Sequence, residues 1–131
     1  TSEGDERRAI DNIMTRLRSM VEETGAGIIL VSHLRRVDGN KGHENGIQVS
    51  LSHLRGSNSI AQLSDCVIAL ERNQQATDPE ESRTTKVRIL KSRYTGDVGL
   101  ATHLLYDGDT GRLAEVVDDF DDLQSEQGDA F

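Results

Sequence analysis

Three side chains with useful chemistry lie within four residues of one another, at Lys91, Arg93 and Tyr94. An ammonium, a planar guanidinium and an aromatic ring stand just before a glycine-rich turn, Thr95-Gly96-Asp97-Val98-Gly99. A guanidinium offers paired N–H donors that match an oxyanion or a phosphate. The same pattern occurs in a solvated β-hairpin with ordinary surface charges. The hairpin alone therefore leaves an anion-binding site and a plain surface turn as alternatives.

The residues on both sides of this cluster predict a β-hairpin and a further strand, which would position it. Val87 and Ile89 alternate with Arg88, as in a half-buried strand, and residues 100–106 predict the returning strand. A second turn at 106–113 leads to a last short strand. The cluster is thus expected at the tip of a hairpin.

The first part of the chain predicts a helix and then a buried strand. Gly25 follows the helical segment and can adopt the left-handed conformation that ends helices. The run Ile28-Ile29-Leu30-Val31 suits a strand buried on both faces of a parallel sheet. Helix and strand would form the second half of a β-α-β unit, whose first strand is expected upstream of Thr1. Apolar residues repeat at helical spacing at Ile10, Ile13, Met14, Leu17, Met20 and Val21.

The middle of the chain predicts a short helix at 60–64 and a second buried strand at 66–70. Residues 35–50 and 73–83 are too polar for a core and are expected to be loops. Polar side chains at the carboxyl ends of parallel strands lie where open α/β sheets bind ligands. We therefore expect ligand-binding side chains directly after the strand at 28–31, in Ser32-His33-Leu34-Arg35-Arg36.

The charge of the chain is unevenly distributed. The net charge is −8, but residues 118–131 contain six acids and no base, which leaves −2 on the first 117 residues. A nearly neutral domain with an acidic tail is expected, and the low hydrophobicity of the tail predicts disorder. The single Cys66 excludes an internal disulfide and indicates a reducing compartment. No apolar run approaches the roughly 18 residues of a membrane span, so no membrane association is expected.

Five segments occur in the order and with the spacing of a known family. They resemble the C-terminal part of ring helicases of the bacterial DnaB type, which include T7-like phage primase-helicases and the mitochondrial helicase Twinkle. The resemblance implies an α/β fold, the C-terminal half of a RecA-like P-loop ATPase core with a mostly parallel sheet plus a β-hairpin. Residues 1–116 would be this partial domain and 117–131 a disordered tail. The five segments are Val31-Ser32-His33-Leu34-Arg35, Leu54-Arg55-Gly56-Ser57, Gln62-Leu63-Ser64-Asp65, residues 69–75 and residues 90–99.

Two motifs that such an ATPase needs are absent from the sequence. There is no G-x-x-x-x-G-K-[ST] loop to bind the β- and γ-phosphates, and no apolar strand ending in Asp before the first helix to hold magnesium. The resemblance implies that both lie upstream of Thr1, so the chain alone is expected to be inactive. With the missing N-terminal half it would form a homo-hexamer that hydrolyses ATP or dTTP with Mg²⁺. Hydrolysis would drive 5′-3′ translocation on single-stranded DNA and duplex unwinding, in the cytoplasm of an infected bacterium.

The resemblance also implies roles for residues near the nucleotide. Arg93 matches the arginine finger, which reaches across a subunit interface to the neighbour's γ-phosphate, and Lys91 is similarly placed. His33 matches a residue that senses the γ-phosphate; the alternative is a strand-end histidine bonded to backbone. Tyr106 matches a ring that stacks on the base, or is a half-buried strand tyrosine, and Arg72 matches an arginine near the nucleotide. No residue of this chain is expected to bind a metal.

DNA contact is expected on the two loops that follow the strand ends, with a solvated loop as the alternative. Cations and glycine amides suit the tracking of a single-stranded backbone without base recognition. Tyr94 replaces a family phenylalanine that abuts the fork. The candidate contacts are Arg35, Arg36 and Lys41 in the first loop, and Arg55, Gly56, Ser57 and Asn58 in the second.

The tail ends in Phe131, an apolar ring at the terminal carboxylate. In the family a similar tail docks on the replicative DNA polymerase, which the resemblance implies here; the alternative is a tail that only confers solubility. For the chain as a whole, two other classes stay open. One is a non-catalytic interaction module, and the other is a fragment of a RecA-type recombinase, although the Lys-Ser-Arg-Tyr-Thr-Gly-Asp hairpin favours the helicases.

Overall fold

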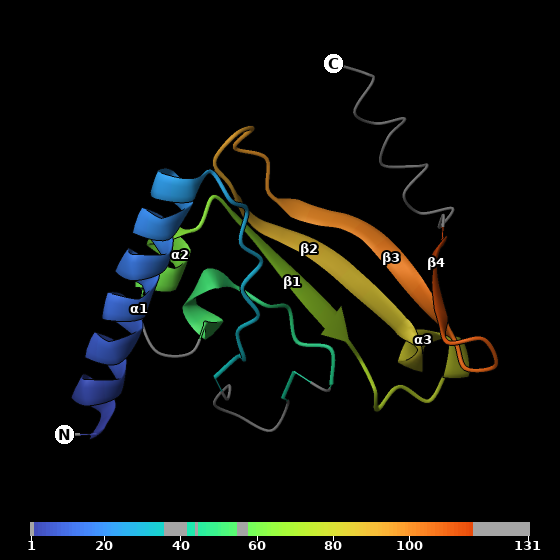
Figure 1. The fold of residues 1–131 in the computed structure, drawn as a ribbon. Helices are drawn as coiled ribbons and strands as arrows, with labels where there is room; N and C mark the ends of the chain where they lie inside the picture. The colour runs from blue at the N-terminus through green and yellow to red at the C-terminus, as the bar shows by residue number, and fades with distance from the viewer. Residues whose placement is uncertain (1, 36–41, 44, 55–57, 117–131) are drawn as a thin grey trace, which may run out of the picture.

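The computed structural model describes residues 2–35, 42–43, 45–54 and 58–116. A long N-terminal helix stands beside one end of a four-stranded sheet, and a short helix lies between the two (Figure 1). The elements are α1 (Ser2–Thr24), the 3-10 helix η1 (Leu51–His53), α2 (Ser59–Leu63), β1 (Cys66–Arg72), α3 (Pro79–Ser82), β2 (Thr84–Ser92), β3 (Gly99–Asp107) and β4 (Arg112–Val116).

Helix α1 forms where the apolar spacing predicts it. Met14, in the middle of the stripe, is buried, whereas the charged residues of the opposite face are exposed. The helix ends at Gly25, whose φ of 71° lies in the left-handed region and whose amide donates to the carbonyl of Val21 at 2.8 Å. The terminating glycine was therefore predicted correctly.

The sheet is an antiparallel meander in the order β1-β2-β3-β4 (Figure 1). The predicted hairpin is confirmed as β2 and β3, with the turn of residues 93–98 at the end of the sheet that faces the C-terminal end of α1. The α/β class is confirmed. Among the described strands every pairing is antiparallel, so the parallel pairing expected for the segment at 66–70 does not occur there.

The prediction of a buried strand at 28–31 is wrong. Residues 25–33 form no regular structure, and Ile29 and Val31 are 97% and 86% exposed. An apolar β-branched run forms a buried strand only when a neighbouring strand pairs with its backbone and a second layer covers its side chains. No described residue pairs with the backbone of this run or covers its side chains. The run therefore stays an irregular segment.

Strand β1 is buried on one face only. Val67, Ala69 and Glu71 are buried, while Ile68 and Leu70 on the other face are exposed. The prediction of a strand buried on both faces is therefore wrong, since no described element covers the second face. The small core lies on the covered side, and its buried apolar members are Met14, Val49, Ile60, Val67 and Ala69.

A bulge in β2 changes which side chains share a face. Val67 of β1 pairs with Lys91, and Ile68 pairs with Ile89, so Leu90 is the extra residue of β2. Residues directly opposite each other project from the same face of a sheet. Ala69 pairs with Arg88, so the bulge places Arg88 and Lys91 on one face although three positions separate them.

Candidate functional site

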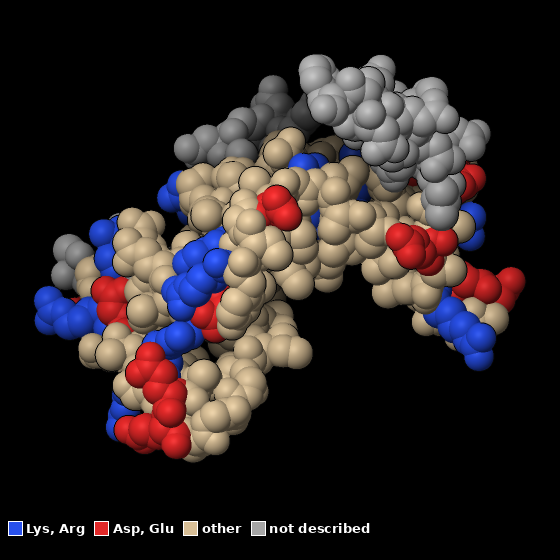
Figure 2. All heavy atoms as spheres, turned by 90° about the horizontal axis from the view of Figure 1, so that it is seen from above, with Lys and Arg blue, Asp and Glu red and all other residues tan. Residues whose placement is uncertain are grey.

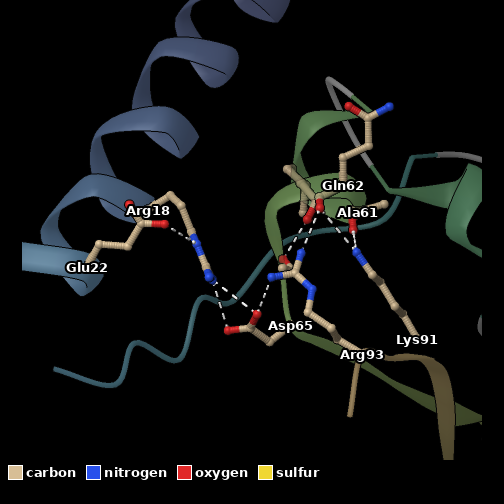
Figure 3. Close-up of polar contacts among 9 residues, drawn as sticks. Arg18, Glu22, Ala61, Gln62, Asp65, Lys91 and Arg93 are labelled. Carbon is tan, nitrogen blue, oxygen red and sulfur yellow. Dashed lines mark hydrogen bonds and ion pairs between the residues drawn. The ribbon is translucent and has the colours of Figure 1, made fainter. Parts of the chain in front are cut away.

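The two cations of the hairpin cluster are anchored to the end of α2 (Figure 3). The ammonium of Lys91 donates to the carbonyls of Ala61 at 2.7 Å and Gln62 at 3.2 Å. The guanidinium of Arg93 also donates to the carbonyl of Gln62, at 3.3 Å. Because the last carbonyls of a helix have no partner within it, two cations satisfy them here. The structure thus brings Lys91 and Arg93 together.

A single carboxylate links Arg93 to helix α1. Nη1 of Arg93 donates to Oδ1 of Asp65 at 2.6 Å, and Nη1 of Arg18 lies 3.1 and 3.0 Å from the two carboxylate oxygens (Figure 3). Arg18 also pairs with Glu22 across 3.4 Å. The Asp65 hydrogen bonds and charge raise the pKa of Arg18 above its usual range, so this cation stays charged. The site at the hairpin is therefore a network of three segments: α1, the α2–β1 junction and the β2–β3 turn.

Tyr106, expected to stack on the nucleotide base, and Arg72, expected near the nucleotide, lie at the opposite end of the sheet. Arg72 pairs with Thr85, which pairs with Leu104, and Tyr106 follows two residues later on the same face. Both side chains are exposed. Tyr106 lies seven positions along β3 from Gly99 at the turn, which at about 3.3 Å per residue is roughly 20 Å. The structure brings Arg72 and Tyr106 to one region and keeps them far from Arg93.

His33 does not stand at the end of a strand, as was expected. It is exposed within the irregular segment after α1, and its carbonyl accepts the hydroxyl of Ser32 at 3.3 Å. The expected position depended on a strand at 28–31, and that strand is not formed. The role of His33 toward a phosphate stays a prediction.

The stems of the two expected DNA loops lie side by side. Leu34 forms an isolated antiparallel bridge with Leu54, and the amide of Arg35 donates to the carbonyl of His53 at 2.9 Å. His43 adds a contact of 3.3 Å between Nε2 and the carbonyl of Arg35, and its ring meets that of His53 edge-on at 5.2 Å. The two loops expected to contact DNA therefore begin next to each other.

A concave surface of about 700 Å³ lies next to these stems, between α1, η1 and α2. Arg35 and Asn58, both predicted to contact DNA, line it together with Arg7 of α1. Gln62, whose carbonyl receives Lys91 and Arg93, lines the same surface. On the face seen in Figure 2, basic and acidic side chains lie next to one another rather than in separate areas.

Tyr94 lies at the hairpin turn and is highly exposed, in keeping with a ring that could meet another molecule. Among the described residues, no group of three or more His, Cys, Asp or Glu side chains could hold a metal ion. No helix in the described part of the chain is long and apolar enough to cross a membrane. The remaining predicted contacts lie outside the described residues: Arg36, Lys41, Arg55, Gly56, Ser57 and Phe131, with the rest of the tail.

Sequence reasoning missed three residues of these sites. Asp65 appeared only as part of a family segment, and neither Arg18 nor Arg7 was singled out. Asp65 lies 47 residues from Arg18 and 28 from Arg93. No local sequence pattern predicts such a contact. The one available indication was a carboxylate at a junction between a helix and a strand.

Comparison with known proteins identifies the family. The family model described as the DnaB-like helicase C-terminal domain matches residues 1–115. A DNA helicase/primase of Enterobacteria phage T3 is 44% identical over 113 residues, which are 86% of this chain and 19% of that protein. The chain thus spans about a fifth of the length of this relative. The resemblance seen in the sequence is confirmed: the chain belongs to the DnaB-like helicase C-terminal domain family.

Proposed function

We propose that this chain is the C-terminal part of a hexameric replicative DNA helicase. The complete ring would couple hydrolysis of ATP or dTTP to 5′-3′ translocation on single-stranded DNA and to duplex unwinding, in the cytoplasm of an infected bacterium. Family membership supports a helicase over a RecA-type recombinase. The assembled helicase would consist of this chain joined to the N-terminal half that would supply the phosphate-binding loop.

The observation that carries the proposal is the separation of two sets of residues. Lys91 and Arg93 lie at the turn of the β2–β3 hairpin, and Arg72 and Tyr106 lie roughly 20 Å away along the same sheet. We infer that the two sets contact nucleotides at two different sites. A ring accommodates this arrangement, because each nucleotide lies between two subunits, one offering the base-stacking ring and the other the arginine.

The residues at each end suit parts of a nucleotide. The guanidinium of Arg93 is 42% exposed and fixed by two partners, which suits contact with a phosphoryl group. Bound nucleotide would supply the phosphoryl group whose transfer to water releases the energy. The cavity at Arg72 measures only about 100 Å³, below the roughly 300 Å³ of small-molecule pockets. The phosphate loop and most of the pocket walls would therefore come from outside this chain.

Single-stranded DNA would pass the paired loop stems and the concave surface beside them. Arg7, Arg35 and Asn58 offer two cations and an amide toward a phosphate backbone, and the surface also includes one carboxylate, Asp11. Because Gln62 lines this surface and also receives Arg93, movement of α2 would reach both sites. Exposed Tyr94 would meet the duplex at the fork.

The decisive experiment replaces Arg93 in the assembled helicase. Arg93→Ala should lower DNA-stimulated turnover by about 10³-fold or more while nucleotide affinity changes little, because an arginine finger stabilises charge that develops in the transition state. The matched control is Arg112→Ala, an exposed arginine of β4 with no assigned role. Rings mixed from Arg93→Ala subunits and subunits without the phosphate-loop lysine should regain part of the activity. Lost affinity with intact turnover would contradict the finger assignment.

The acidic tail would dock on the replicative DNA polymerase. Six acids would steer it to a basic surface, and Phe131 would enter a small apolar pocket. Deleting Phe131 should raise the dissociation rate from the polymerase at all salt concentrations, whereas neutralising the aspartates should mainly slow association at low salt. Equal polymerase binding by the tail-less protein would leave solubility as its role.

A further inference from the structure

Asp65 has a central position beside the proposed finger. It follows α2 and precedes β1, and its side chain receives Arg18 from one direction and Arg93 from another (Figure 3). The backbone of Asp65 takes part as well, because its carbonyl accepts the amide of Arg93 at 2.8 Å. One residue therefore holds Arg93 by both its main chain and its side chain.

The environment of this contact separates it from an ordinary surface ion pair. The side chain of Asp65 is 32% exposed, and that of Arg18 is 30% exposed. Arg18 places a single nitrogen, Nη1, at 3.1 and 3.0 Å from the two carboxylate oxygens, so the carboxylate turns both oxygens toward α1. The Asp65 carboxylate, held by Arg18 of α1, thus defines the direction in which the guanidinium of Arg93 lies.

The contact orients Arg93 without neutralising it. Nη1 of Arg93 meets Asp65 and Nη2 meets the carbonyl of Gln62, which leaves the Nε–H and the second hydrogens of both terminal nitrogens for another acceptor. Asp65 divides its charge between two arginines, so it compensates the charge of Arg93 only in part, while Arg18 has Glu22 as a second partner. A guanidinium that is fixed, partly exposed and still cationic suits a phosphate that arrives from outside.

We propose that Asp65 is a positioning residue for Arg93. It holds the guanidinium in the direction in which it meets the phosphate of a nucleotide on the neighbouring subunit, and Arg18 holds Asp65 in turn. This inference rests on the proposed function of Arg93. It adds that helix α1 takes part in setting the direction of the finger, because Arg18 belongs to that helix.

The test measures nucleotide hydrolysis by the assembled helicase with Asp65→Asn, which removes the charge and keeps the shape. Turnover (kcat) should fall about 10- to 100-fold, the range that misplacement of a catalytic group by about 1 Å produces, while KM changes less than about threefold. Glu22→Gln is the matched control, since Glu22 is a carboxylate that binds Arg18 and not Arg93. It should leave kcat unchanged. Asp65→Glu keeps the charge and should retain more turnover than Asp65→Asn.

A double-mutant cycle separates positioning from a general structural role. In an Arg93→Lys background the ammonium cannot form the planar pair, so Asp65→Asn should cost less than about threefold in kcat. An equal loss in both backgrounds would mean that Asp65 acts on the fold and would overturn the proposal. If Asp65→Asn does not assemble into rings, Asp65→Glu takes its place in the cycle.

The outcomes distinguish this inference from the one on which it rests. Normal kcat for Asp65→Asn, together with strongly reduced kcat for Arg93→Ala, would refute the positioning role and leave the finger standing. Normal kcat for Arg93→Ala would refute the finger itself and, with it, this inference. Selective loss of kcat in Asp65→Asn that shrinks in the Arg93→Lys background would support both.

Discussion

The ion pair between Glu71 and Arg88 allows the sharpest stability prediction. Glu71 is the one charged residue among the described residues that is buried, with its side chain 3% exposed, and that of Arg88 is 16% exposed. Arg88 donates from Nε to both carboxylate oxygens, at 3.2 and 2.9 Å, and from Nη2 at 3.2 Å. The amide of Val49 donates to Oε2 of Glu71 at 2.8 Å. Arg88→Met would remove three of these four hydrogen bonds and leave the Glu71 carboxylate buried without its counterion.

The expected loss follows from this geometry. Removal of one partner from a buried pair costs about 3–5 kcal/mol, because the remaining charge has neither water nor a counterion. Small domains have a total free energy of unfolding of about 5–15 kcal/mol. With a urea dependence of about 1–3 kcal/mol per M, the unfolding midpoint of the isolated chain should fall by about 1 M or more.

Urea unfolding followed by circular dichroism measures this loss, and hydrogen exchange at Val49 measures its local effect. Val49 belongs to the segment that returns from the first of the two loops predicted to contact DNA, and its amide should exchange faster when the pair is broken. Glu71→Leu combined with Arg88→Met removes the buried charge and should recover part of the stability. Glu22→Gln breaks an exposed pair and should cost less than about 0.5 kcal/mol. An Arg88→Met midpoint equal to the wild-type midpoint would show that the carboxylate reaches water, and the argument would fail.

Three further predictions concern single residues. Arg35→Gln in the assembled helicase should reduce the slope of log affinity for single-stranded DNA against log salt by about 0.7, measured by fluorescence anisotropy, and an unchanged slope would move the DNA path elsewhere. Lys91→Met should destabilise the isolated chain by about 1–3 kcal/mol in urea, because it leaves the carbonyl of Ala61 without its cation and that of Gln62 with Arg93 alone; full stability would mean that water replaces the ammonium. The amide of Asp109 and the hydroxyl of Thr110 donate to Asp107 and lower its pKa below the ordinary 3.8, so the stability from this carboxylate is present above about pH 4 and lost as pH falls through the lowered pKa. Asp107→Asn should therefore be less stable than the wild type at pH 7, with a difference that shrinks as pH falls through the lowered pKa, and a constant difference would exclude the linkage.

Local patterns predicted the elements whose stability depends on their own residues. The stripe around Met14 and the stop at Gly25 marked α1, and the alternation at 86–90 with its glycine-rich turn marked the β2–β3 hairpin. A helical face and a hairpin turn are encoded within a few residues of one another. These predictions therefore did not require knowledge of the rest of the fold.

The failures have one physical cause, which is dependence on distant partners. The apolar run at 28–31 has the composition of a buried strand, but a strand also requires neighbours, and the described residues provide none. The exposed face of β1 has the same explanation. The bond from Arg18 to Asp65 joins residues 47 positions apart, and composition carries no information on such a contact. Family resemblance supplied the identity of Arg93 as a candidate but did not identify what orients it.

The bulge at Leu90 divides β2 into two halves, one of which contributes to the core and the other to the hairpin site. Before it, Arg88 faces Glu71 in the core, so changes there act on folding. After it, Lys91 and Arg93 face the end of α2, so changes there act on the hairpin site. Because the extra residue resets the alternation, insertion or deletion at position 90 would turn the two cations to the other face while leaving the core pair in register. The length of β2 at this point thus determines on which face Lys91 and Arg93 lie, and a sequence comparison that tolerates gaps here would miss it.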